Sequence, residues 1–226
     1  MNNLQDRVDV ITGATGTAGH AAAKALAERG AKLVLISHDL QKLEPLVSSL
    51  GLGPERVLAL EANLLDPLQA KSAAGAVAQA FGRVDILLHL VGGWLGGKSL
   101  VETPAEDFKE MLDQHVWTTV HVFQAFVPLM IGHQWGRVMI VSSPVASLPS
   151  AGRAAYAAAK AAQEALLLTL STELKGTGIT ANIFQVRSID VEGSGRGTPP
   201  NDLAAAILRL CSDQSARENG ERFPLY

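Results

Sequence analysis

The chain has 226 residues, 47% of them hydrophobic, and a formal net charge of −3. That much apolar sequence can bury the core of one domain covering residues 1–226, whereas the slight acidity and the lack of a long basic run argue against a nucleic-acid surface. With a single cysteine, no signal-peptide pattern and no apolar stretch near the roughly 18 residues of a membrane span, we expect a cytoplasmic protein that binds neither nucleic acid nor a membrane.

Short apolar runs alternate with longer helical patterns along the chain, which is typical of a parallel sheet covered by helices on both faces. The predicted strands are Val8–Thr12, Lys32–Ser37, Arg56–Leu60, Val84–His89, Gly136–Ser142, Ile179–Phe184 and Glu221–Leu225. The predicted helices are Thr17–Arg29, Leu40–Leu50, Pro67–Phe81, Ala105–Gly132, Ala151–Lys175 and Asn201–Ser212. This order predicts an α/β fold, a doubly wound parallel β-sheet with helices on both faces.

The first predicted strand leads through a glycine-rich loop directly into a helix. The loop is Thr12-Gly13-Ala14-Thr15-Gly16-Thr17-Ala18-Gly19. Its three glycines have the spacing for a tight turn, a close approach to pyrophosphate and close helix packing, and the helix N-terminus offers free N–H groups to phosphates. Glycines at such a turn also occur without a ligand, but this order of strand, loop and helix favours dinucleotide binding.

The end of the second strand bears on the choice between NAD and NADP. An acidic residue about 20 positions beyond the loop would bind the adenosine ribose of NAD. Asp39 is at that distance, but it lies beyond the strand and is better suited to cap the next helix. The strand ends in Ser37 and His38, neither of which is acidic, and His38 could face a 2′-phosphate. The sequence therefore favours NADP.

Tyr156 and Lys160 are four residues apart in an alanine-rich predicted helix. That spacing puts both side chains on one face, about one turn apart. A nearby cation favours phenolate, so Lys160 should lower the pKa of Tyr156 and prepare it for proton transfer between a carbonyl and an alcohol. Any alanine-rich helix can carry this pair by chance, so the pair alone is weak support for catalysis.

Together, these features resemble the short-chain dehydrogenase/reductase family over nearly the whole chain. The Thr-Gly loop, the strand Val84–Leu88, the strand from Gly136 ending in Ser142-Ser143, and Tyr156-x-x-x-Lys160 appear in the family's order. The resemblance implies a Rossmann-type domain that uses NADP or NAD to transfer hydride to or from a small carbonyl compound or secondary alcohol.

The family also implies roles for individual residues. Its serine holds the substrate oxygen, its tyrosine exchanges the proton, and its lysine binds the nicotinamide ribose; these roles fall on Ser143, Tyr156 and Lys160. The expected cofactor-binding residues are Gly13, Thr15, Gly16, Thr17, Gly19, Ser37, His38, Asn63, Leu64, Val91, Gly92, Lys160 and Val186. For Asn63, a contact with the adenine edge and a simple loop role are equally open.

Several positions depart from the family pattern near the nicotinamide end. The usual Asn-Asn-Ala-Gly is His89-Leu90-Val91-Gly92, and the Pro-Gly after the sixth strand is Val186-Arg187. These changes keep open a second hypothesis, a dinucleotide-binding sensor or regulatory protein with little turnover.

His115 aligns with the asparagine that completes the family's catalytic tetrad, and we include it among the candidate catalytic residues. An imidazole titrates near neutral pH and could relay a proton between the lysine and solvent. The alternative is a histidine packed in its helix.

The remaining histidines, Asp9 and Trp94 give weaker indications of function. The histidines lack the spacing of a zinc helix, so no metal site is expected. Asp9 interrupts the first strand and is expected near its solvent end. Trp94 could wall the substrate pocket or anchor a loop.

The glycine-rich gap at residues 187–200 is expected to be a mobile substrate lid. The family pairs the Tyr156 helix and the long helix before it across subunits, which implies a homodimer or homotetramer, although both helices could simply cover their own sheet.

Overall fold

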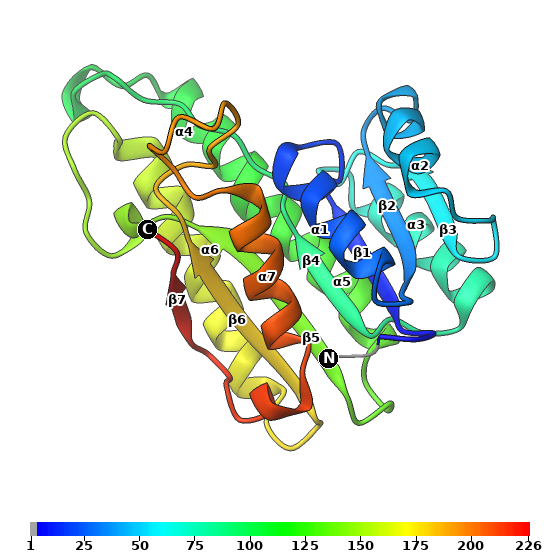
Figure 1. Ribbon diagram of the computed structural model, residues 1–226. Helices are drawn as coiled ribbons and strands as arrows, with labels where there is room; N and C mark the ends of the chain where they lie inside the picture. Colours follow the sequence, from blue (N-terminus) through cyan, green and yellow to red (C-terminus); the bar gives the residue numbers. More distant parts are fainter. Residues whose placement is uncertain (1–3) are drawn as a thin grey trace.

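The computed structural model describes residues 4–226, in which seven parallel strands form one sheet in the order β3-β2-β1-β4-β5-β6-β7 (Figure 1). The strands are β1 (Val8–Thr12), β2 (Lys32–Ser37), β3 (Val57–Glu61), β4 (Ile86–His89), β5 (Gly136–Ser142), β6 (Ile179–Gln185) and β7 (Arg222–Pro224). The strand order reverses direction between β1 and β4. The predicted doubly wound parallel sheet is therefore confirmed.

Helices cover both faces of this sheet. They are α1 (Thr17–Ala27), α2 (Glu44–Leu50), α3 (Pro67–Phe81), α4 (Ala105–Leu112), α5 (Thr118–Phe126), α6 (Ala154–Glu173) and α7 (Pro200–Leu210). Short 3₁₀ segments lie at Gln41–Leu43, Leu100–Glu102, Val127–Leu129, Pro144–Ala146 and Asp213–Ser215. Within residues 4–226, no helix is long and apolar enough to span a membrane.

Two hydrophobic cores result from the alternation of side chains along the strands. In β1, Val10 packs with α3, α5 and α6 on one face, whereas Ile11 packs with α1 and α7 on the other. Figure 1 shows these two groups of helices on opposite faces of the sheet. Neighbouring strand residues point to opposite faces, so a strand covered on both sides needs apolar residues throughout. The central strands are mostly apolar, with Asp9 of β1 and Arg137 of β5 among the buried exceptions. Because the strands are parallel, their carboxyl ends lie at one common edge.

The predicted helix Ala105–Gly132 is not a regular α-helix. The helical path continues from Ala105 to Leu129 but passes through a π-helical segment, Asp113–Trp117, between α4 and α5. The hydroxyls of Thr118 and Thr119 each donate to a carbonyl four residues earlier, at 2.6 Å. Threonine hydroxyls that bond to these carbonyls compete with the regular helical pattern. Most other predicted elements differ from the structure by a few residues at their ends.

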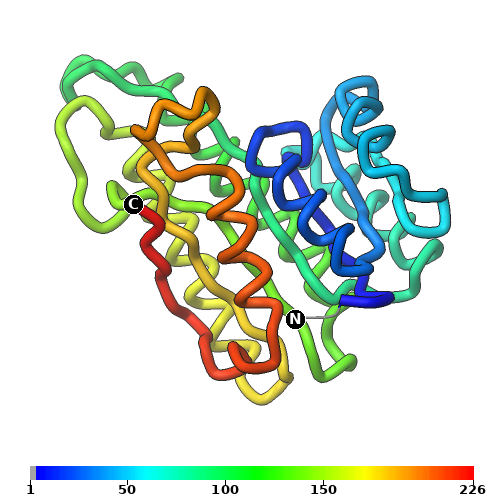
Figure 2. The backbone as a smooth tube through the Cα atoms, viewed as in Figure 1, coloured from blue at the N-terminus to red at the C-terminus, as the bar shows by residue number. Residues whose placement is uncertain are grey.

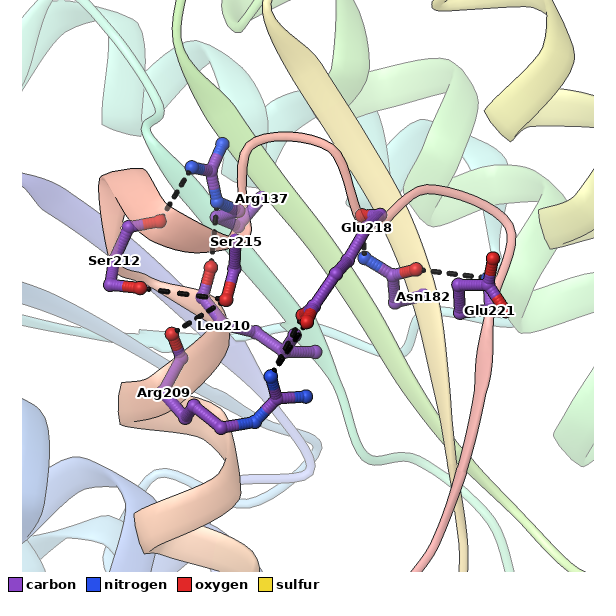
Figure 3. Close-up of polar contacts among 8 residues, drawn as sticks. All are labelled: Arg137, Asn182, Arg209, Leu210, Ser212, Ser215, Glu218 and Glu221. Carbon is purple, nitrogen blue, oxygen red and sulfur yellow. Dashed lines mark hydrogen bonds and ion pairs between the residues drawn. The ribbon is translucent and has the colours of Figure 1, made fainter.

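A polar network fixes the chain between α7 and β7 (Figure 3). The buried guanidinium of Arg137 donates to the carbonyls of Leu210 (2.7 Å) and Ser212 (3.1 Å) just after α7. Asn182 of β6 donates to the Glu218 carbonyl at 2.7 Å. The chain then runs alongside β6 as β7 and closes this edge of the sheet (Figure 2).

Asp9 does not lie at the solvent end of its strand, so this prediction is wrong. Its side chain is fully buried, and neither carboxylate oxygen has a hydrogen-bond partner. β1 is flanked by β2 and β4 and covered by helices on both faces, so even its second residue is out of solvent. Burial, reinforced by the nearby Asp85 carboxylate, raises the pKa of Asp9 well above its ordinary value.

Asp9→Val should raise the free energy of unfolding by about 1–3 kcal/mol near neutral pH, because an apolar side chain removes an unpartnered buried acid. A raised folded-state pKa makes wild-type Asp9 increasingly unfavourable as pH rises above the unfolded-state pKa of about 3.9. The gain should therefore shrink as pH falls toward about 4. Chemical denaturation across this pH range measures both effects.

Asp85→Val is the matched control. The Asp85 carboxylate accepts from Arg7 (2.8 Å), Arg83 (2.6 Å) and the Val8 N–H (3.0 Å), so its replacement must destabilise the protein. An Asp9→Val protein that is less stable than wild type at every pH would contradict this account.

Candidate active site

The glycine loop is held tightly against the end of β4. Gly13 has φ of 70°, and a Cβ atom there would lie 2.9 Å from the Leu90 carbonyl carbon. A Cβ on Gly19 would lie 2.6 Å from the Ala14 carbonyl oxygen, so α1 packs directly on the loop. These positions need glycine for a tight turn and for close helix packing, as the sequence predicts.

The loop borders a cavity of about 490 Å³, the glycine-loop cavity. The residues predicted to bind cofactor that line it are Gly13, Thr15, Gly16, Ser37, His38, Asn63, Leu64, Val91 and Gly92. Thr17 and Gly19 are not among its lining residues, because they belong to the first turn of α1. Lining residues that sequence reasoning missed are Ile36, Ala62, Leu65, Leu90, Asp113, Gln114 and Thr118. The first four are neighbours of predicted residues, whereas no motif marks the last three.

The end of β2 has the predicted residues Ser37 and His38 next to the glycine-loop cavity. Ser37 is buried and accepts a hydrogen bond from the Asp39 N–H at 3.2 Å, and His38 is exposed. Asp39 accepts from the Gln41 N–H at 3.0 Å, but the N-cap of the 3₁₀ segment is Leu40, so the predicted N-cap is one residue too early. No acidic side chain from this strand end lines the cavity.

Asn63 has a loop role and also borders the cavity. Its side-chain oxygen accepts from the Leu65 N–H at 3.1 Å, and its own N–H donates to Gln69 at 2.8 Å. The loop alternative is therefore present in the structure, while the adenine contact stays a prediction.

A second cavity of about 480 Å³, the tyrosine cavity, lies next to the first and shares Leu90, Val91 and Gly92 with it. Its other lining residues are Gly93, Trp94, His115, Val141, Ser142, Arg153, Tyr156, Lys160, Val186, Arg187, Ser188 and Ile189. The structure thus brings Tyr156, Lys160, His115 and Val186 together. Ser143 does not line the cavity itself, but its side chain lies close enough to the Tyr156 hydroxyl to oppose the effect of burial on the tyrosine pKa.

Tyr156 and Lys160 share one face of α6, and the lysine Nζ lies 6.0 Å from the centre of the tyrosine ring. The predicted lowering of the tyrosine pKa by Lys160 is wrong. Burial raises the pKa of Tyr156, and the opposing influences are Ser143 and Arg153. Burial also lowers the pKa of Lys160 to about 7, so the lysine is only partly charged near neutral pH.

Lys160 is held by a continuous hydrogen-bond chain. Its Nζ donates to the Val141 carbonyl and to Gln163 Oε1, both at 2.8 Å. The fully buried Gln163 amide donates to Thr119 Oγ1 at 2.9 Å, and that hydroxyl donates to the His115 carbonyl at 2.6 Å. Sequence reasoning missed Gln163 and Thr119, since nothing in the motif identifies them.

His115 is not a residue that titrates near neutral pH. It is 1% exposed, and burial lowers its pKa to about 3. Its Nε2 lies 2.9 Å from the Gly93 carbonyl, which can only accept, so Nε2 carries the proton and Nδ1 is a bare acceptor. The ring packs edge-on against Tyr156 at 5.5 Å. The ring is therefore packed and neutral near neutral pH, as the alternative describes, while a catalytic role for His115 stays a prediction.

His89 is also buried and neutral, with its pKa lowered by burial to about 3. Its Nδ1 lies 2.7 Å from Thr12 Oγ1, and its Nε2 lies 3.4 Å from Thr118 Oγ1. This histidine replaces the family's asparagine and links β1 to the start of α5.

The predicted lid borders the tyrosine cavity through Arg187, Ser188 and Ile189. Ile189 and Thr198 form a short bridge, and Asp190 accepts from the Gly195 N–H at 2.7 Å. These contacts close residues 189–198 into a compact loop. Trp94 lines the cavity and is 57% exposed, so it walls the pocket at its mouth.

Known proteins with the same arrangement identify the class. The short chain dehydrogenase family model matches residues 7–196. An uncharacterized oxidoreductase of Mycobacterium tuberculosis is 34% identical, over 94% of this chain and 88% of its own length. The 3-oxoacyl-[acyl-carrier-protein] reductase FabG of Escherichia coli is 25% identical, over 97% of this chain and 95% of its own.

Solved structures agree with this result. A protein of Pseudomonas syringae described as a short chain dehydrogenase is 28% identical with a TM-score of 0.91, covering 99% of this chain and 96% of its own. The fold and the order of the motifs define a dinucleotide-dependent oxidoreductase. The chain belongs to the short-chain dehydrogenase family, whose members use NAD or NADP.

Gln163→Leu should lower the pKa of Lys160, because the ammonium loses a buried acceptor, whereas Gln163→Glu should raise it by adding a negative charge. We expect each variant to move the lysine titration midpoint by about one pH unit. NMR titration of labelled lysine side chains measures this without relying on activity. Exposed Gln124→Leu is the control, and identical midpoints in all four proteins would refute the role of Gln163.

Proposed function

We propose that this protein transfers hydride between NADP or NAD and a small ketone, aldehyde or secondary alcohol. The observation that carries the proposal is that Tyr156 and Lys160 line the same cavity, with Ser143 close to the tyrosine hydroxyl. That cavity adjoins the glycine-loop cavity, so a dinucleotide in one can extend into the other.

The residues around the glycine-loop cavity suit a dinucleotide. Gly13 leaves no room for a side chain, and α1 begins at Thr17 with no acidic residue in its first turn. Backbone N–H groups at this helix end would bind pyrophosphate, while Ser37, His38 and Asn63 would line the adenosine end. When bound, the nicotinamide supplies or accepts the hydride.

Ser143 and Tyr156 would hold the substrate oxygen between them. Because burial raises the pKa of Tyr156, its hydroxyl stays protonated near neutral pH and serves as a proton donor. This favours carbonyl reduction. Lys160 lines the same cavity with two protein acceptors on its Nζ, which aim the group while leaving capacity for a ribose hydroxyl.

NADP is the favoured cofactor. The end of β2 offers a buried serine and an exposed histidine to the cavity, with no carboxylate to repel a 2′-phosphate.

We also propose a homodimer or homotetramer. α6 presents the small exposed side chains Ala158, Ala161 and Ala165 along one side. Leu112 and Trp117, on the helical path before it, are 36% and 51% exposed. Small flat faces next to exposed apolar side chains allow close packing between subunits.

A dinucleotide-binding sensor is the second candidate. Arg187 in place of a glycine at the end of β6 lines the tyrosine cavity and changes its nicotinamide end. Tight cofactor binding without turnover across a panel of carbonyls would favour the sensor.

Tyr156→Phe should reduce turnover about 10²–10⁴-fold while leaving cofactor affinity nearly unchanged, because only the proton-donating hydroxyl is removed. Steady-state kinetics and cofactor titration measure the two quantities. The control is Tyr226→Phe, which removes the hydroxyl of the chain's only other tyrosine. Wild-type turnover in Tyr156→Phe would overturn the assignment.

Ser37→Asp should shift cofactor preference from NADPH toward NADH, because the new carboxylate repels a 2′-phosphate. Fluorescence titration with both cofactors gives the ratio of dissociation constants, for which we expect a change of about tenfold or more. Ser72→Asp adds the same charge on the exposed side of α3 and should leave the ratio unchanged. A wild-type protein that strongly prefers NADH would contradict the proposed NADP preference.

A further inference from the structure

The tyrosine cavity has an unbalanced positive charge. Arg153 and Arg187 carry this charge, Lys160 is only partly charged near neutral pH, and none of the lining residues is Asp or Glu. The chain as a whole carries a net charge of −3. A cationic cavity in an acidic protein is therefore a local feature and does not reflect overall composition.

The two arginines are not neutralised by the protein. Across residues 4–226, neither Arg153 nor Arg187 forms an ion pair, whereas other arginines pair with Asp85, Glu164 and Glu218. The Arg187 guanidinium lies 4.9 Å from the centre of the Tyr226 ring, a contact that orients the group and leaves its charge intact.

Arg153 is positioned close to the reacting tyrosine. It immediately precedes α6, whose first turn contains no acidic residue, so the positive end of the helix dipole adds to its charge. Its charge also acts on Tyr156, where it opposes the effect of burial on the tyrosine pKa. A negative group bound at Arg153 would thus lie near the proposed proton donor.

Two buried polar atoms on the cavity lining also lack partners. Ser142 Oγ and His115 Nδ1 have no hydrogen-bond partner, although both residues are 1% exposed. Both atoms have almost no exposed surface, so they bear on the packing around the cavity and the charge of the two arginines carries the inference.

We propose that the substrate is a small carbonyl compound bearing a carboxylate, that is, an oxo acid. This rests on the proposed function: Ser143 and Tyr156 take the carbonyl oxygen, and Arg153 and Arg187 take the carboxylate. The planar, five-donor guanidinium matches the two carboxylate oxygens. A cavity of about 480 Å³ that also receives the nicotinamide has space for a small acid.

The reaction consumes the reduced cofactor and one proton, which solvent returns to Tyr156 after the transfer. Hydride from the reduced cofactor forms a C–H bond at the carbonyl carbon, the C=O π bond breaks, and Tyr156 gives its proton to the oxygen. The carboxylate is unchanged, and the product is a hydroxy acid.

Three oxo acids and their methyl esters form the kinetic test: 2-oxobutanoate, acetoacetate and levulinate. We expect at least one acid to exceed its ester in kcat/KM by about tenfold or more. If every ester equals or exceeds its acid, the inference is overturned while the proposed oxidoreductase stands. A greater preference for dihydroxyacetone phosphate over dihydroxyacetone would also overturn the carboxylate assignment.

Calorimetry provides a readout that needs no turnover. Each acid and ester is titrated into protein saturated with oxidised cofactor, in which a ketone cannot be reduced. Selective binding of an acid without catalysis of its reduction would support the anion site and reject the oxidoreductase. No binding of any acid, or equal binding of acid and ester, would reject the anion site.

Substitutions test whether the two arginines cause the preference for an acid over its ester. Arg153→Leu and Arg187→Leu should each lower the acid-to-ester ratio about tenfold, and Arg187→Lys should retain part of it. Arg217→Leu is the matched control, since Arg217 is exposed, unpaired and outside both cavities. An unchanged ratio in both arginine-to-leucine variants would overturn the proposal.

Discussion

The site depends on a contact between two backbones. Gly13 lies so close to Leu90 and Val91 that no side chain fits between them, and this joins the end of β1 to the end of β4. The sheet reverses its strand order at the same point, so the connections diverge to opposite faces and leave a crevice. Both cavities meet there, at Leu90, Val91 and Gly92.

Beneath this crevice, buried polar groups replace the asparagines that the family resemblance leads one to expect. His89 and His115 are both neutral, so they add fixed hydrogen-bonding groups without adding charge. Gln163 then links Lys160 to Thr119 and the π-helical segment. The Gln163 amide thus positions Lys160. The nicotinamide end of the site is formed by residue types that differ from those of the family pattern.

The doubly wound parallel sheet, the glycine turns and the grouping of Tyr156 with Lys160 followed from periodicity, local motifs and the family resemblance, whereas the order of the strands came from the structure. The errors concern burial and long-range contacts. Asp9 was misplaced because one polar residue in an apolar strand does not reveal that the strand is central. The tyrosine pKa was misjudged because residue spacing shows a neighbouring charge but not desolvation. Gln163 was missed because its partner Thr119 lies on another helix, and no local sequence pattern indicates that the two side chains are in contact.

The central claim is that the two adjoining cavities form one hydride-transfer site. The most direct test is to incubate the protein with cofactor carrying deuterium at the reactive nicotinamide carbon, together with acetoacetate, and to examine the product by NMR. The account predicts 3-hydroxybutanoate with deuterium on its carbinol carbon and a primary isotope effect on turnover. Tight cofactor binding with no deuterium in any product, for acetoacetate and for a wider panel of ketones and aldehydes, would contradict it.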